Sequence, residues 1–163
     1  MSVKFGLPPI ACPDARLFIL GSLPGDASLS ARRYYAHPRN QFWRLLGHVL
    51  GSELHSLSYE QRLERLAAHR IGLWDVVASA SRPRSLDQAI REAEHNRVDR
   101  LLHDFPELTA IAFNGGKAAQ IGRALIADPT VTLLDLPSSS PANTRPFAEK
   151  AAAWEALKEF VEP

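Results

Sequence analysis

The sequence predicts an α/β protein in which a parallel sheet carries helices on both faces. Four short apolar runs alternate along the chain with segments of helical periodicity, and short connections join them. Apolar runs without polar alternation are typical of strands that are buried on both faces. Strands that alternate with helices over short connections form parallel sheets. Because the chain shows no internal repeat and no linker, residues 1–163 are predicted to form one domain.

The first part of the chain predicts an extended arm, a strand and a turn. Three prolines in residues 1–15 favour an arm that lies on the surface. The apolar residues 16–20 predict the first strand, and the sequence GSLPG at 21–25 predicts a tight turn. An arginine- and tyrosine-rich loop is expected to connect this turn to Asn40.

The middle of the chain predicts two helices, a strand and a third, shorter helix. A helix is expected to follow Asn40, because apolar residues recur at helical spacing up to a C-cap at Gly51. Ser58 and Gln61 match a capping box that opens a helix over 59–70. The second strand is predicted at 71–79, followed by a polar loop at 80–85 and a short helix at 85–93.

The last part of the chain predicts two further strands, each followed by a helix. Asn96 is expected to cap a helix that Pro106 stops. Residues 108–113 form the third predicted strand, and a glycine turn and a helix follow it. The fourth strand is predicted at 131–136. A final helix is predicted at about 146–162, where apolar side chains form one stripe.

The composition excludes several classes of protein. An apolar content of 45% and a charged content of 23% are typical of globular domains. The single cysteine, Cys12, cannot form an internal disulfide, and the histidines show no metal-binding spacing, so we expect no metal and no cofactor. The chain has no run of 18 apolar residues and no signal-peptide pattern. We therefore expect a cytoplasmic protein, with no membrane partner.

All four predicted strands end in loops of turn-forming and polar residues. Because parallel strands end at one edge of a sheet, these loops are expected to form a ligand site there. The glycine turn before Lys117 offers free N–H groups at a helix N-terminus, which suits an anion, but it also fits a plain turn with a solvated lysine. The turn matches neither a P-loop nor a dinucleotide-binding fingerprint.

Basic and aromatic residues concentrate between positions 32 and 44. Five basic side chains are interleaved there with three aromatic ones: Arg32, Arg33, His37, Arg39 and Arg44, with Tyr34, Tyr35 and Trp43. Basic groups contact phosphates, and aromatic rings stack on exposed bases. Because the net charge is only +1, this local cluster indicates nucleic-acid binding, with a solvated surface above an aromatic core as the alternative.

Three polar residues stand out against their surroundings. Asn40 precedes a helix and is a strong N-cap candidate, which does not exclude a catalytic role. Asp75 interrupts an apolar strand, and a buried carboxylate is destabilising without a partner, so it either pairs inside the protein or faces the binding edge. Asn114 is a second candidate helix cap. The serines at 138–140 have no neighbouring base, so a serine-hydrolase triad is not expected.

Five segments, in this order, resemble the hypoxanthine-DNA (deoxyinosine) glycosylase branch of the uracil-DNA glycosylase superfamily: GSLPG, YYAHPRNQFW, GLWDV, FNGGKA and LPSSSPANT. The resemblance extends over about residues 17–154. It implies a three-layer α/β/α sandwich with a central four-stranded parallel sheet. It also implies a monofunctional glycosylase that flips a deaminated base out of DNA, above all hypoxanthine, and hydrolyses its N-glycosidic bond to initiate base excision repair.

The resemblance further implies roles for individual residues. The asparagine of the HPRN segment, Asn40, is expected to be catalytic and to hold the attacking water. Asp75 is expected to accept the N1–H group of hypoxanthine, because an ionised carboxylate only accepts hydrogen bonds. The expected base pocket consists of Gly21, Ser22, Leu23, Pro24, Gly25, Phe42, Asp75 and Asn114. The expected contacts to the DNA backbone and minor groove come from Arg39, Lys117, Ser138, Ser139, Ser140 and Pro141.

Two residues depart from the pattern of the superfamily. Leu23 stands where many members carry the water-positioning Asp or Asn, and Leu136 stands where other branches carry a histidine that stabilises the leaving base. Leu136 argues against efficient uracil excision. The alternatives are a uracil- or mismatch-specific glycosylase, a non-catalytic nucleic-acid-binding domain of the same fold, and a small-molecule nucleotide-binding protein. The expected partner is DNA that contains a deaminated base, bound by a monomer in the cytoplasm at the nucleoid.

Overall fold

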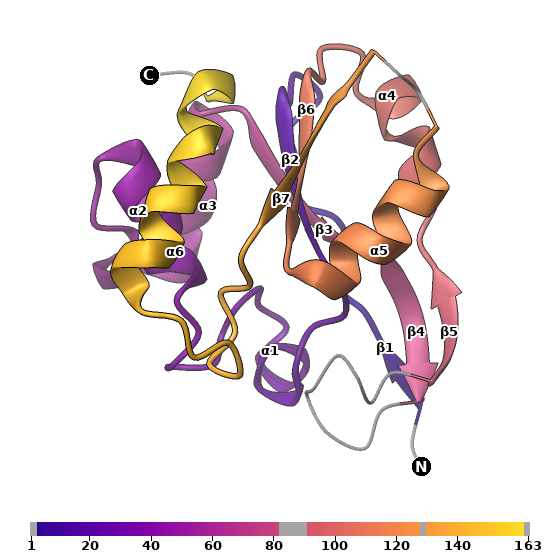
Figure 1. Cartoon of the computed structure of the whole chain (residues 1–163), viewed down its shortest axis with the longest axis horizontal. Coiled ribbons are helices and arrows are strands. Elements are labelled where there is room, and N and C mark those ends of the chain that lie inside the picture. Colours follow the sequence, from indigo (N-terminus) through magenta and orange to yellow (C-terminus); the bar gives the residue numbers. More distant parts are fainter. Residues whose placement is uncertain (1–2, 82–90, 128–129, 162–163) are drawn as a thin grey trace.

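The computed structural model describes residues 3–81, 91–127 and 130–161. At its centre is a parallel sheet with the strand order β3-β2-β6-β7. These strands are β2 (Leu17–Gly21), β3 (Ile71–Asp75), β6 (Ala110–Asn114) and β7 (Thr132–Leu136). Helices lie on both sides of the sheet, as Figure 1 shows. The predicted α/β/α sandwich with a four-stranded parallel sheet is confirmed.

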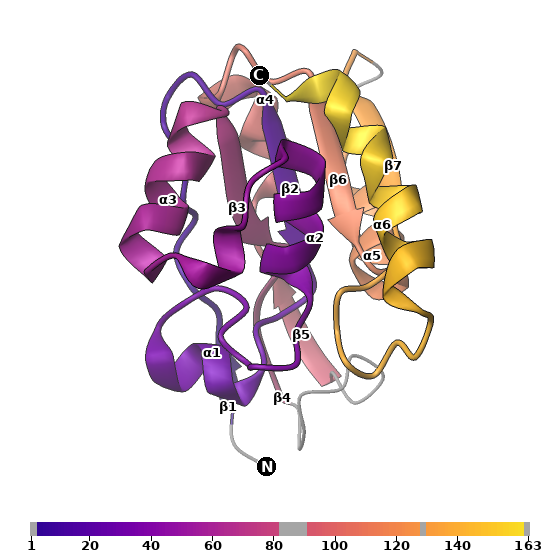
Figure 2. The same cartoon turned by 90° about the vertical axis from the view of Figure 1, so that its left-hand side faces the viewer.

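One face of the sheet is covered by three helices, which Figure 2 shows in front of the strands. They are α2 (Phe42–Leu50), α3 (Tyr59–Ala68) and α6 (Phe147–Trp154), and a 3-10 helix at Glu155–Phe160 continues α6. Alternate residues of β2, Leu17 and Ile19, pack into this layer beside Trp154. The predicted capping box at the start of α3 is present, and Gly51 ends α2 with a φ of 69° as expected.

The opposite face carries α5 (Gly116–Leu125), α4 (Leu101–Asp104) and the 3-10 turn Val98–Arg100 that precedes α4. The other alternate residues of β2, Phe18 and Leu20, pack into this second core. The strand is therefore apolar along its whole length because it is buried on both faces. Among the described residues, no helix is both long and apolar enough to cross a membrane.

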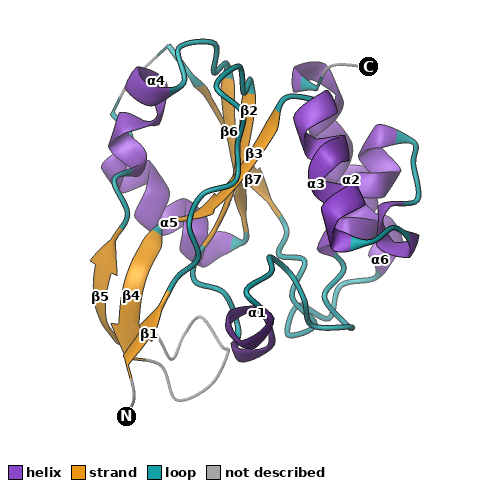
Figure 3. Cartoon of the chain, turned by 180° about the vertical axis from the view of Figure 1, so that it is seen from behind, coloured by secondary structure: helices purple, strands orange, loops and turns teal. Residues whose placement is uncertain are grey.

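A second, antiparallel sheet lies beyond α5 and was not predicted. Its strands are β1 (Val3–Phe5), β4 (Val77–Ser81) and β5 (Arg91–His95), in the order β1-β4-β5, as Figure 3 shows from behind. The predicted single strand at 71–79 is therefore wrong: the chain leaves the parallel sheet after Asp75. Part of the expected N-terminal arm is a strand for the same reason, because β1 pairs with β4.

Other predictions also differ from the structure. Asn96 does not cap a helix, because its side-chain Nδ2 donates to the Asp75 carbonyl at 2.7 Å. The segment after the GSLPG turn is not all loop, because α1 (Asp26–Ala31) begins directly after Gly25. The helix predicted at 85–93 falls mostly on residues outside the described ones, and its last three residues begin β5, so the prediction is wrong for 91–93. Both segments are short and polar, and neighbouring elements decide their structure more than their own periodicity does.

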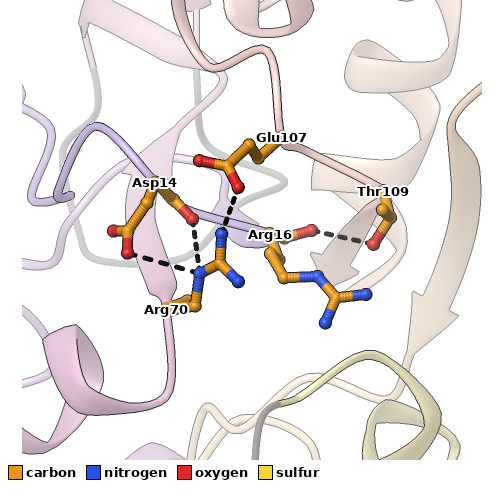
Figure 4. Close-up of polar contacts among 5 residues, drawn as sticks. All are labelled: Asp14, Arg16, Arg70, Glu107 and Thr109. Carbon is orange, nitrogen blue, oxygen red and sulfur yellow. Dashed lines mark hydrogen bonds and ion pairs between the residues drawn. The ribbon is translucent and has the colours of Figure 1, made fainter.

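The amino ends of the parallel strands are tied together by what we call the amino-end clasp: Asp14, Arg16, Arg70, Glu107 and Thr109. Figure 4 shows the Arg70 guanidinium between the two acidic residues. Its Nε lies 3.3 Å from Asp14 Oδ2, and its terminal nitrogen lies 2.6 Å from Glu107 Oε1. The Arg16 carbonyl accepts hydrogen bonds from the Thr109 amide (2.8 Å) and hydroxyl (3.2 Å). The clasp joins the segments that enter β2, β3 and β6.

Candidate active site

A pocket of about 600 Å³ opens at the carboxyl edge of the parallel sheet, where the sequence places the polar loops. Its walls come from the turn after β2, the segment before α2, the ends of β3 and β6, and the loop after β7. All but two of the predicted site residues line it: Gly21, Ser22, Leu23, Pro24, Gly25, Arg39, Asn40, Asp75, Asn114, Ser138, Ser139, Ser140 and Pro141.

Three side chains form a hydrogen-bonded series in the pocket wall, which we call the amide–hydroxyl chain: Asn114, Ser139 and Asn40. Asn114 Nδ2 donates to Ser139 Oγ at 2.9 Å, and the Ser139 amide donates back to Asn114 Oδ1 at 2.9 Å. The Ser139 hydroxyl then donates to Asn40 Oδ1 at 2.8 Å. The chain thus couples the end of β6, the loop after β7 and the start of α2.

The amide–hydroxyl chain determines which atoms of the Asn40 side chain can bind a ligand. Asn40 Oδ1 also accepts the backbone N–H of Phe42 at 2.9 Å, so the predicted capping interaction is present. Because a backbone N–H can only donate, this bond fixes which atom of the amide is oxygen. Two donors occupy both lone pairs of Oδ1. Asn40 Nδ2 makes no hydrogen bond within the described residues, so Asn40 offers N–H donors to a ligand.

Asn114 does not cap α5, although the sequence allowed that role. The N-cap of this helix is Gly115, whose φ of 105° favours glycine, and no side chain caps it. A Cβ on Gly115 would also lie 3.1 Å from Ser138 Cβ, so the loop after β7 approaches closely here. The Asn114 amide is therefore free to bind Ser139.

Asp75 is buried at the end of β3, with 3% of its surface exposed, and lines the pocket. A Cβ built on Gly21 would lie 2.6 Å from Asp75 Oδ1 and 3.0 Å from the Tyr35 hydroxyl. Both polar side chains therefore converge on Gly21, where only a glycine leaves room for them. Tyr35 adopts a φ of 56°, an uncommon backbone conformation for a non-glycine residue.

Phe42 is not a pocket residue, so that prediction is corrected. It is the first residue of α2, and its fully buried ring packs edge-on against Trp43 and Trp154. The Tyr35 ring stacks on it at a centroid distance of 3.9 Å and an interplanar angle of 13°. Tyr35 therefore stands between Phe42 and the pocket. The sequence names Tyr35 only as one of several aromatic residues in a basic cluster.

The structure also revises two of the expected DNA contacts. The Ser139 side chain cannot contact a DNA backbone, because the residue is 1% exposed and its hydroxyl lies inside the amide–hydroxyl chain. Lys117 is half-buried on α5 and does not line the pocket. The neighbouring serines do line it, together with Pro141 and the exposed Arg39.

Two other residues line the pocket, of which sequence reasoning named His37 only within the basic cluster and did not name Asn143. His37 Nδ1 accepts the backbone N–H of Arg39 at 3.1 Å, which shapes the segment before Asn40. Asn143 Nδ2 donates to the Ser138 carbonyl at 3.0 Å, which closes the loop after β7 on itself. The sequence signal that could have identified both residues was their position within the HPRN and SSSPAN segments. A histidine or an asparagine alone does not indicate a hydrogen bond to the backbone of a neighbouring residue.

Tyr34 lines the pocket on the side of the N-terminal arm, and its hydroxyl donates to the Pro8 carbonyl at 2.8 Å. Burial, and then the nearby Asp75 carboxylate, raises the pKa of Tyr34 well above its ordinary value. The phenol therefore stays protonated and remains a hydrogen-bond donor. Among the described residues, no three His, Cys, Asp or Glu side chains gather in a way that suits a metal ion.

The sequence model of the Uracil DNA glycosylase superfamily matches residues 8–158, most of the chain, including every pocket residue named above. The chain belongs to the uracil DNA glycosylase superfamily. Two curated members of comparable length are similar to it. A protein from Methanosarcina barkeri (strain Fusaro / DSM 804) is 41% identical over 156 residues, and one from Methanosarcina acetivorans is 41% identical over 155 residues. Each alignment covers 95% of this chain and 98% of the relative.

Both relatives are named hypoxanthine DNA glycosylase, which confirms the resemblance that the sequence motifs indicate. A solved structure is similar as well: the solution NMR structure of a Methanosarcina acetivorans protein named "putative Uracil DNA glycosylase". It has a TM-score of 0.87 and 39% sequence identity, and the match covers 98% of this chain and 99% of that chain. This superfamily member therefore has the same fold over its whole length.

Proposed function

We propose that this protein is a monofunctional DNA glycosylase that hydrolyses the N-glycosidic bond of deoxyinosine and releases hypoxanthine. The observation that carries the proposal is the pocket that brings Asn40 and Asp75 together, in a chain 41% identical to two hypoxanthine DNA glycosylases. Its volume of about 600 Å³ is sufficient for a purine base. Such a base reaches the pocket only when it is flipped out of the duplex.

Asp75 supplies the base recognition in this proposal. The N1–H group of hypoxanthine is a hydrogen-bond donor, and an ionised carboxylate is an acceptor with no competing N–H. The close approach of Asp75 Oδ1 to Gly21 supports this role, because it places the carboxylate against the turn after β2. Replacing Asp75 with Asn would add two donors at the same position and weaken the recognition of an N–H group.

The hydrogen bonds of Asn40 change the role that the resemblance implies for it. An amide that holds a nucleophilic water accepts one of the water's O–H bonds, but two protein donors already occupy Asn40 Oδ1. We therefore propose that Asn40 Nδ2 donates to the leaving base. Preorganised donors that face a developing negative charge stabilise the transition state strongly.

The reaction then proceeds by heterolysis of the C1′–N9 bond. The base departs with the bonding electron pair, and the negative charge on it is stabilised by the N–H donors of Asn40. The sugar is left as an oxocarbenium ion, to which water adds, and the proton of that water passes to solvent. The departed base anion takes up a proton from solvent at a ring nitrogen. The products are free hypoxanthine and an abasic site. No lysine lines the pocket among the described residues, in keeping with a glycosylase that leaves the strand intact.

The rim of the pocket supplies the proposed contacts to DNA. Arg39 lies exposed on one side, and Ser138, Ser140 and Pro141 line the other. Basic side chains and backbone N–H groups are the usual partners of phosphates. We further propose that residues 1–163 act as one domain and as a monomer on nucleoid DNA in the cytoplasm.

Uracil is the second candidate substrate, because the structural relative with a TM-score of 0.87 carries uracil in its name. Leu136 argues against it. This residue is 4% exposed and belongs to the core between the sheet and α6. It does not line the pocket and offers no hydrogen bond to a leaving uracil.

A base-release assay tests the proposal. Fluorescent duplexes carry one deoxyinosine, deoxyuridine or deoxyxanthosine opposite T, C or G, and alkali cleaves the abasic product. We expect hypoxanthine release by the wild-type protein. No release from any duplex, with salt-sensitive DNA binding retained, would instead indicate a binding domain. Release of uracil alone would assign the protein to the second candidate and contradict the role of Asp75.

Two variants of Asn40 separate the donor role from the water-holding role. Asn40→Asp keeps an oxygen for the Phe42 amide and the Ser139 hydroxyl but has no N–H, so we expect a loss on the order of 100- to 1,000-fold in rate. A residue that holds water would remain active as Asp. Asn40→Ala should lose a similar factor and, because a helix cap is lost, about 0.5–2 kcal/mol of stability, measured by urea unfolding.

A further inference from the structure

A buried lysine lies behind the pocket, on α6. Lys150 is 2% exposed, and its ammonium group donates to two neutral acceptors, Gln41 Oε1 at 2.8 Å and the Asn143 carbonyl at 2.8 Å. Within residues 3–81, 91–127 and 130–161, no carboxylate forms an ion pair with it. A buried charge without a counter-charge is destabilising. The position of Lys150 therefore calls for an explanation other than stability.

The two acceptors belong to the two segments that hold the amide–hydroxyl chain. Gln41 follows Asn40 directly, and its backbone N–H donates to the Ser139 carbonyl at 3.0 Å. Asn143 lies in the loop after β7 and binds the Ser138 carbonyl through its side chain. One ammonium group thus hydrogen-bonds to both walls of the pocket from outside it. Lys150 is 109 residues from Gln41 and 7 residues from Asn143 in the sequence.

We propose that Lys150 is a positioning residue for base release: by joining Gln41 to Asn143, it holds Asn40 and the loop 138–143 in the geometry of the reaction. The proposal rests on the proposed glycosylase function and adds a residue to it. A point-like ammonium suits this task, because its N–H groups bond two acceptors in different directions. An apolar side chain of the same length would fill the space and leave both acceptors unbound.

A direct role in the reaction does not fit the position of Lys150. The side chain does not line the pocket, and two hydrogen bonds hold its nitrogen behind the wall. A lysine that formed a Schiff base with the abasic sugar would have to reach that sugar. Trapping with borohydride checks this point: a covalent wild-type adduct with DNA that Lys150→Met cannot form would overturn the positioning role.

The main test compares Lys150→Met with a matched control, Lys158→Met. Lys158 lies in the 3-10 helix that continues α6, is 52% exposed and pairs with Glu155 at 3.0 Å, away from the pocket. Single-turnover release of hypoxanthine from deoxyinosine duplex is followed over a range of enzyme concentrations, well below the melting midpoints of all variants. This separates the rate constant at saturation from the concentration that gives half of it.

We expect Lys150→Met to lower the saturating rate constant on the order of tenfold to 100-fold, since misplacement of a reacting group by about 1 Å has effects of that size. The half-saturating concentration should change less, and Lys158→Met should behave as wild type. A folded Lys150→Met protein with the wild-type rate constant would refute the inference. Absence of activity in the wild type would refute the proposed function instead.

Chemical restoration of the ammonium group distinguishes a loss of positioning from general damage to the fold. The chain has one cysteine, Cys12, so Lys150→Cys in a Cys12→Ser parent offers a single thiol. Aminoethylation of this thiol in the unfolded protein, followed by refolding, restores an ammonium group on a side chain of lysine length. We expect this step to recover most of the lost rate, whereas ethylation without the amine should not. Equal rates for the two alkylated proteins would contradict the inference.

A second variant covers the case in which Lys150→Met does not fold. Gln41→Leu removes one of the two acceptors and leaves the lysine in place. We expect a smaller loss in the saturating rate constant than for Lys150→Met, again with little change in the half-saturating concentration. An unchanged rate constant in Gln41→Leu would show that the bond to the Asn40 segment has no role in positioning.

Discussion

The two edges of the parallel sheet are both cross-linked by polar side chains, but in opposite ways. At the amino ends, charged groups make the links: the acidic partners of Arg70 in the amino-end clasp have 52% and 56% of their side chains exposed (Figure 4). At the carboxyl ends, neutral amides and a hydroxyl make the links, and Ser139 is 1% exposed.

This difference distinguishes a structural cross-link at the amino edge from a functional site at the carboxyl edge. Exposed ion pairs tolerate small movements and contribute little free energy, because water competes with both partners. Buried amide–hydroxyl bonds have narrow geometry, and an unmade one is destabilising. The carboxyl edge therefore fixes the orientation of Asn40, whereas the amino edge only keeps three segments together. Substitutions at the carboxyl edge should therefore lower activity, whereas substitutions at the amino edge should lower stability alone.

The largest effect should come from breaking the amide–hydroxyl chain. Ser139→Ala removes the hydroxyl that joins Asn114 to Asn40, so we expect base release to slow by about 100-fold. Stability should fall by about 1–3 kcal/mol, because buried partners lose their hydrogen bonds. Ser56→Ala is the control, since its hydroxyl binds the Glu53 carbonyl at an exposed turn. A folded Ser139→Ala enzyme with the wild-type rate would show that the amide–hydroxyl chain has no role in the mechanism.

A smaller effect should follow from crowding the floor of the pocket. A Cβ in Gly21→Ala would lie 2.6 Å from Asp75 Oδ1, so Asp75 must move, and we expect a destabilisation of about 1–3 kcal/mol and weaker base release. Gly116→Ala is the matched control, because a Cβ there meets nothing within 4 Å and should stabilise the protein by about 0.4–1 kcal/mol. Urea unfolding and single-turnover assays measure both; equal behaviour of the two variants would contradict the assignment.

The smallest effect on activity should come from the amino-end clasp. Arg70→Ala removes two exposed ion pairs and should lower stability by about 1 kcal/mol, less at high salt, with base release unchanged. Arg70 has a φ of 60°, so Arg70→Gly should be about 1 kcal/mol more stable than Arg70→Ala. A loss of activity in either variant would show that the two edges are coupled.

Periodicity and apolar runs were sufficient to predict the parallel sheet, because β2, β3 and β6 are buried on both faces. They did not separate β3 from β4, since Val76 and Val77 continue the apolar run while the chain changes partner. There the backbone of Val76 donates to the Gly21 carbonyl and that of Val77 to the Ser22 carbonyl, before β4 joins the second sheet. Pairing between distant segments decides such a change, and local sequence does not record it.

The position of the site could also be predicted, but not its internal contacts. Asn40 stood out as a cap residue before an amphipathic helix, and Asp75 stood out as a carboxylate that interrupts an apolar strand. Ser139 was expected at the DNA because the resemblance implies that role for the loop at 138–141. Lys150 was not noticed, because a lysine within a helix normally points to solvent. In both cases the partner is far away in the sequence.

The distance between these partners has a consequence for synthesis of the protein. Asn40 and Ser139 are 99 residues apart, and Gln41 and Lys150 are 109 residues apart. Contacts with such separations close late in folding, and a chain leaves the ribosome from its N-terminus. A nascent chain can therefore pair β2 with β3 while its pocket still lacks a wall. The protein should acquire its activity only when α6 has emerged from the ribosome.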